Sequence, residues 1–60
     1  MLEVGKVYKI VYKDQDYTKF VKGKLVSEDA HLIKILDSKL GEIIVGKSSI
    51  TSIKEVKNAI

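Results

Sequence analysis

Residues 31–46 read HLIKILDSKLGEIIVG, which is two apolar runs on either side of a polar turn. In the first run Ile33 and Ile35 alternate with residues that face the other way, and in the second run Ile43 and Val45 do the same. Alternation with a period of two is typical of strands with unequal faces, and a short polar turn between two such runs is typical of an antiparallel hairpin. This stretch therefore predicts two antiparallel strands.

The rest of the chain continues this pattern on both sides of the hairpin. Ile and Val together number 15, and their branched side chains suit a pleated strand better than a helix. Polar turns divide the chain into five short runs, at residues 6–13, 17–26, 31–36, 42–47 and 50–56. A helical reading of residues 28–36 stays open, because periodicity alone does not separate a short apolar helix from a strand. The prediction is an all-β domain with no long helix.

The size of the chain limits its architecture. Its 60 residues allow a single domain over residues 1–60. Five short strands are too few for two packed sheets, so they predict one strongly bent, five-stranded antiparallel sheet rolled into a small barrel. Gly23 marks either the bend inside the second strand or a turn that divides it. Self-association is expected, because domains of this size usually need a disulfide, a metal or a second copy for stability.

Composition argues against several functions. With no Cys and only one His, the sequence predicts no disulfide, no metal site and no cofactor. No Ser has an evident base partner, so an enzyme is not expected. There is no apolar run of about 18 residues to cross a membrane. No secretory signal is visible at Met1, so a cytoplasmic location is expected.

Two segments carry a resemblance to a known family. Residues 21–32 read VKGKLVSEDAHL, in which Gly23 is followed by Asp29, a spacer and His31. Residues 41–53 read GEIIVGKSSITSI, in which a Lys precedes small polar residues and a closing Ile-Thr-Ser-Ile. These segments resemble the two short motifs of the Sm-like family of RNA-binding proteins, which includes the bacterial Hfq proteins.

The resemblance implies a fold, an assembly and a ligand. Sm-like proteins are bent barrels that close into homo-oligomeric rings of about five to seven subunits, the fourth strand of one subunit pairing with the fifth strand of the next. Such rings bind single-stranded RNA near the pore. By position, the resemblance implies that His31 stacks on a base, that Lys47 and Ser48 contact RNA, and that Asp29 orders the loop.

The register of the third strand stays open at this stage. Lys34 falls at a position that the family normally fills with an apolar residue. A register shifted by one residue would place Ile33 and Ile35 inside, and His31 would then turn inward with them.

The charge pattern adds candidate contacts for RNA. The chain has 11 Lys and no Arg against 8 Asp and Glu, for a formal net charge of +3. Single-stranded nucleic acids need cations along the backbone path and flat groups for the bases. Tyr17 and Phe20 lie beside Lys19 and Lys22 in the sequence, and Lys22 and Lys24 are the candidate RNA contacts of this kind. Such lysines are also ordinary on strand exteriors, and the aromatic side chains also suit a core.

Two alternatives remain open. The chain could be a protein-interaction module whose exposed strand edge extends the sheet of a partner, with the apolar Ala59 and Ile60 in the contact. It could also be a small basic DNA-binding barrel. Either would be a monomer or a dimer without catalytic activity.

Overall fold

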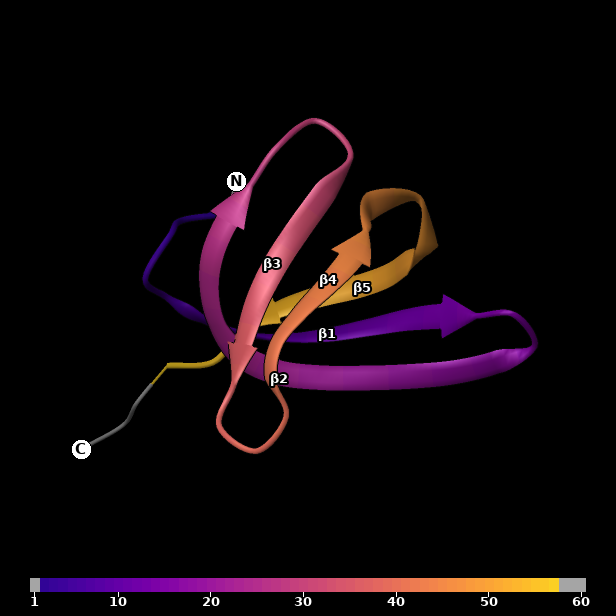
Figure 1. The fold of residues 1–60 in the computed structure, drawn as a ribbon, viewed down its shortest axis with the longest axis horizontal. Helices are drawn as coiled ribbons and strands as arrows, with labels where there is room; N and C mark the ends of the chain where they lie inside the picture. Colours follow the sequence, from indigo (N-terminus) through magenta and orange to yellow (C-terminus); the bar gives the residue numbers. More distant parts are fainter. Residues whose placement is uncertain (1, 58–60) are drawn as a thin grey trace.

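The computed structural model describes residues 2–57, which form five strands and one turn of 3-10 helix (Figure 1). The elements are β1 Val7–Asp14, β2 Tyr17–Glu28, β3 Leu32–Asp37, β4 Gly41–Gly46, η1 Lys47–Ser49 and β5 Ile50–Glu55. The predicted all-β fold without a long helix is confirmed. Within residues 2–57 there is no helix with the length and apolar character needed to cross a membrane. Ala59 and Ile60, proposed above for a protein contact, lie outside the described residues.

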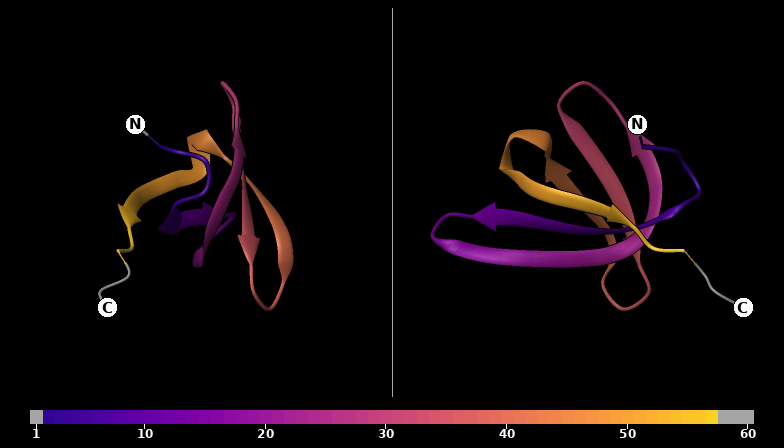
Figure 2. Two further views of the ribbon diagram at one scale, coloured as in Figure 1. Left: turned by 90° about the vertical axis from the view of Figure 1, so that its left-hand side faces the viewer. Right: turned by 180° about the vertical axis from the view of Figure 1, so that it is seen from behind.

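The strands form one antiparallel sheet in the order β4-β3-β2-β1-β5. Successive strands pair as hairpins from β1 to β4, and η1 carries the chain back so that β5 pairs with β1. The sheet is strongly bent, so that its two ends lie across from each other (Figure 2). No ladder joins β4 to β5 in the described part of the chain, so the strongly bent sheet has two open edges and the predicted barrel is not closed.

The bend lies in β2, the longest strand at 12 residues. Its first part pairs with β1 as far as Lys24, and its last part pairs with β3 from Lys24 onward. Gly23 sits at this change of partner, and a Cβ atom there would collide with the Leu36 carbonyl oxygen and lie 2.7 Å from Ile35 Cγ2. Of the two alternatives for Gly23, the bend inside a strand is therefore the correct one.

The core lies on the concave face of the sheet. Four strands supply its buried residues, which are Tyr8, Ile10, Val21, Leu25, Ile33, Ile35 and Val45. Burial of Ile33 and Ile35 settles the register of β3, because Leu32 and Leu36 are then on the outer face. The expectation that His31 turns inward with this register is wrong. His31 lies in the loop before β3, where its side chain is exposed.

The spacing of Ile50 and Ile53 has a structural cause in β5. Both pack against the core although they are three residues apart. The register with β1 slips here, since Tyr12 pairs with Ile50 while Val11 pairs with Ser52. The residue left between them bulges, so the apolar face shifts by one position. η1 makes the short connection between β4 and β5, and the bulge in β5 accounts for the spacing.

Candidate nucleic-acid interface

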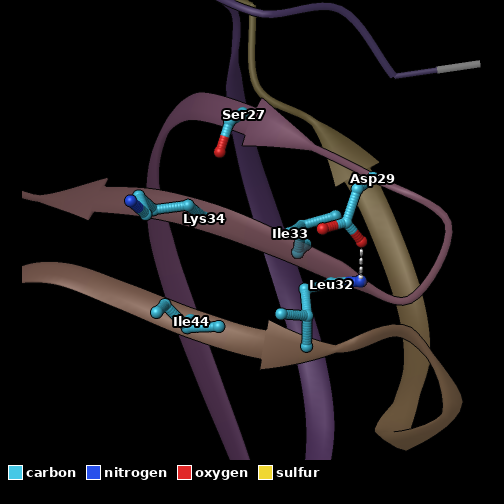
Figure 3. Close-up of a pocket in the computed structure, with 6 residues that line it drawn as sticks. All are labelled: Ser27, Asp29, Leu32, Ile33, Lys34 and Ile44. Carbon is cyan, nitrogen blue, oxygen red and sulfur yellow. Dashed lines mark hydrogen bonds between the residues drawn. The ribbon is translucent and has the colours of Figure 1, made fainter.

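The loop between β2 and β3 is ordered by one carboxylate. Asp29 Oδ1 accepts hydrogen bonds from the backbone N–H groups of His31 and Leu32, both at 2.7 Å, and Figure 3 shows the bond to Leu32. These two bonds stabilise the charged carboxylate and hold the pKa of Asp29 below its ordinary value. Asp29 therefore has the loop-ordering position that the sequence predicts, and it presents the exposed His31 side chain at the end of the sheet.

A backbone hydrogen bond brings the two sequence segments together. The Lys47 N–H donates to the His31 carbonyl oxygen at 2.8 Å, continuing the ladder in which Leu32 pairs with Gly46. Ser48 follows Lys47 in η1 and is exposed. We call Asp29, His31, Lys47 and Ser48 the loop cluster, since all four lie at this end of the sheet.

The ammonium group of Lys47 has a partner that the sequence does not reveal. Lys47 Nζ lies 2.8 Å from Glu28 Oε2, and both side chains are only about one-third exposed, at 35% and 28%. A phosphate group would compete with Glu28 for this ammonium group. Glu28 and Asp29 together outweigh Lys47, so the formal charge of these three side chains is −1.

A shallow groove of about 240 Å³ adjoins the loop cluster on the outer face of the sheet. Its lining side chains come from the end of β2, the loop, β3 and β4 (Figure 3), and they are Ser27, Asp29, Leu32, Ile33, Lys34 and Ile44. Leu32 and Ile44 are 42% and 61% exposed, so the groove is partly apolar. Lys34 Nζ lies 3.8 Å from Glu42 Oε1, and this ion pair reduces the positive charge at the rim of the groove.

Lys22 and Lys24 are not part of the loop cluster. Lys24 pairs with Leu36, whereas the loop precedes Leu32 at the other end of β3, about 13 Å away along the strand. Both lysines are exposed on the convex face of the sheet. There Lys22 lies directly opposite Lys9 on β1, and Lys9 lies directly opposite Lys54 on β5.

Sequence reasoning missed the alignment of Lys22, Lys9 and Lys54 across three strands, because this alignment depends on the register between the strands. The alternation in β1 places Lys9 on the outer face, but the sequence alone does not show which residue of β2 or β5 lies opposite. The length of the turn between β1 and β2 is the one local signal that could have indicated the pairing of Lys9 with Lys22.

The aromatic side chains divide between the core and the surface. Tyr8 is buried, and its hydroxyl oxygen accepts a hydrogen bond from the Glu3 N–H at 2.9 Å. Tyr12 packs against the core. Tyr17 and Phe20 are 68% and 71% exposed, so these two, with His31, are the most exposed flat side chains among the residues described here.

The described residues contain no group of three His, Cys, Asp or Glu side chains that could hold a metal ion. Comparison of the chain with protein families, curated proteins and solved structures finds no match. What the fold and the surface show is a small all-β domain. It is built on one bent antiparallel sheet with a basic convex face.

Proposed function

We propose that the chain is a cytoplasmic, non-enzymatic RNA-binding protein that acts as a homo-oligomer and takes single-stranded RNA at the loop cluster. The observation that carries this proposal is the backbone bond between Lys47 and His31, which holds two residues 16 positions apart in the sequence at the same end of the sheet. An exposed imidazole beside a cation and a hydroxyl is an arrangement that can stack on an unpaired base and contact its phosphate.

The proposed assembly is a ring of about five to seven subunits in which β4 of one subunit pairs with β5 of the next. It is supported by the open edges of β4 and β5, whose backbone groups have no ladder partner on that side within residues 2–57. The small core supports it too, because in residues 2–57 seven buried apolar residues are matched by eight large apolar side chains that remain exposed. Exposed sheet edges and apolar surface both favour association.

The proposed contacts differ in what they supply. His31 stacks on a base, and the Ser48 hydroxyl hydrogen-bonds a base edge or a phosphate oxygen. Lys47 binds a phosphate and releases Glu28 as it does so. The energetic gain from Lys47 is therefore a difference between two ion pairs, and His31 is expected to contribute more to affinity.

Fluorescence anisotropy of labelled oligo-U with His31→Ala and Glu28→Gln variants tests the proposal. The first variant is expected to bind about tenfold more weakly, which is the range measured for loss of one stacked base. The second is expected to bind more tightly, because Lys47 no longer has a competing carboxylate. Ser38→Ala, an exposed change in the turn between β3 and β4, serves as the control. Equal binding by His31→Ala and the control would contradict the proposal, and so would tighter binding of duplex DNA than of oligo-U.

A second candidate function is favoured by the groove on the outer face. Leu32 and Ile44 are exposed beside the open β4 edge, which is the arrangement that an added strand from another protein requires. In this case β4 is an interaction edge, and the chain is a protein-interaction module. A monomeric mass in solution together with no salt-sensitive binding to oligo-U would favour this candidate over RNA binding.

A further inference from the structure

The convex face of β5, β1 and β2 carries a continuous basic surface. Lys54, Lys9 and Lys22 stand in one row across the three strands, because Lys9 is the direct partner of both other residues. Lys24 follows two residues beyond Lys22 and on the same side of β2. We call these four residues the lysine row. Neighbouring strands are about 4.8 Å apart, so the Cα atoms of Lys54, Lys9 and Lys22 lie within about 10 Å.

The lysine row has no acidic partner within residues 2–57. None of its four members takes part in an ion pair with another described residue, whereas Lys6, Lys19, Lys34 and Lys47 all do. The cross-strand register places no carboxylate among its neighbours on the convex face. Like charges directly opposite each other destabilise a sheet. A surface that keeps two such pairs without a counter-charge is suited to a polyanion that supplies the counter-charge.

An aromatic ring lies next to the row. Phe20 is 71% exposed, and Lys9 Nζ is 5.6 Å from the centre of its ring. Val11, the cross-strand partner of Phe20, is half-buried. Phe20 and Val11 together form a small apolar patch next to Lys9 and Lys22. A phosphate path along lysines with a flat ring beside it matches the requirements of an unpaired strand, whose bases are free to stack. In a duplex the bases are already stacked and do not offer their faces.

We propose that the lysine row and Phe20 form a second binding surface for single-stranded nucleic acid, separate from the loop cluster. Phosphate groups of the nucleic acid contact Lys54, Lys9 and Lys22. A base stacks on the ring of Phe20, either replacing the Lys9 ammonium group there or lying beside it. This inference concerns the same class of ligand as the proposed function, but it rests on different side chains and on a different face of the sheet.

A pair of matched double variants tests the surface with labelled oligo-U of about 12 nucleotides, within the usual site size for such domains. Lys9→Gln with Lys22→Gln removes two members of the row. Lys19→Gln with Lys39→Gln removes the same charge elsewhere, since Lys19 is on the opposite face of β2 and Lys39 is in the turn after β3. The variant with Lys9→Gln and Lys22→Gln is expected to bind at least about tenfold more weakly. The slope of its log binding constant against log salt concentration is expected to fall in magnitude by about 1.4, the value for two lost phosphate contacts. An equal loss in both variants would overturn the inference.

Phe20 provides an independent arm of the test. Phe20→Leu keeps an apolar side chain but removes the ring, and Phe20→Trp enlarges the ring. Because the residue is exposed, neither change is expected to affect folding, which circular dichroism checks. Binding is expected to fall about tenfold in the first variant and to be retained in the second. Equal binding by both variants, or a preference for a duplex of equal length, would contradict a stacking surface.

The two proposals fail in different ways. Loss of binding in His31→Ala with full binding in the Lys9 and Lys22 double variant would leave the loop cluster standing and overturn the second surface. The reverse result would support the lysine row and overturn the loop cluster.

Discussion

At the scale of single residues, Asp29 does more for the structure than its exposure suggests. Its carboxylate is the acceptor for two backbone N–H groups at the turn into β3, and it thereby sets the position of His31. Asp37 does the same at the turn into β4, where it accepts bonds from Lys39 and Leu40. In both residues these bonds lower the pKa of the carboxyl group.

The lowered pKa of Asp29 predicts a pH dependence of stability. Because the pKa is lower in the folded chain than in the unfolded chain, the stabilisation is complete above the ordinary value of 3.8 and is lost as the pH falls through the folded value. Asp29→Ala should therefore melt at a lower temperature than the natural chain at pH 6, and this difference should disappear toward pH 2. Thermal melts followed by circular dichroism measure it. Asp16→Ala, whose carboxylate accepts none of the side-chain hydrogen bonds found in residues 2–57, is the control. A difference that stays constant down to pH 2 would contradict this role.

At the scale of the elements, Gly23 allows the sheet to bend. The Leu36 carbonyl oxygen and the Ile35 side chain occupy the space that a side chain at position 23 would need. Since backbone atoms cannot move aside as a flexible side chain can, even a methyl group forces β2 and β3 apart.

Gly23→Ala is expected to lower the free energy of unfolding by about 3 kcal/mol, at the upper end of the usual range for overpacked sites. Gly46→Ala is the matched control, because a Cβ atom at Gly46 meets nothing within 4 Å and its φ of −72° suits any residue. Urea unfolding of the two variants gives both values. Equal stability of Gly23→Ala and Gly46→Ala would show that the bend does not depend on this contact.

The lysine row makes a second prediction at this scale, which concerns the stability of the fold. Lys22→Glu places a carboxylate opposite Lys9 and should raise stability by about 0.5 to 1 kcal/mol, or a few degrees in melting temperature. The gain should shrink in high salt, which screens exposed charges. Lys24→Glu makes the same charge change opposite Val7 and Leu36 and should not give this gain. Equal melting temperatures for the two variants at low salt would contradict the assigned register.

The elements also show what sequence reasoning can and cannot establish. The five strands followed from alternation and turns, because burial on one face of a bent sheet imposes a period of two. The bend at Gly23 could be narrowed only to two alternatives, since its cause is a contact with β3 rather than a local preference. Ion pairing between Glu28 and Lys47, and the row formed by Lys9, Lys22 and Lys54, depend on which strands meet and in which register. Apart from the length of the turn between β1 and β2, which bears on the pairing of Lys9 with Lys22, no local pattern encodes that information.

At the scale of the whole molecule, the chain combines a minimal core with open edges. Leu36, Leu40 and Ile44 are 46%, 75% and 61% exposed near the β4 edge of the sheet. The edge of β5 lies at the other end of the strand order. Pairing of these two edges between copies would satisfy the backbone groups of both edges and bring the basic faces of several copies close together. Binding to RNA would then depend on the oligomer, because each added subunit contributes further phosphate contacts.

The most direct test of the account is sedimentation equilibrium of the chain at micromolar concentration with a fluorescent oligo-U, recorded at the absorbance of the dye. The account predicts that the dye sediments with a protein mass of about five to seven times the 6.7 kDa of one chain. It also predicts that this complex dissociates as salt is raised. Dye that sediments as the free oligonucleotide at low salt, with the protein present as a 6.7 kDa monomer, would contradict both the proposed assembly and the proposed ligand.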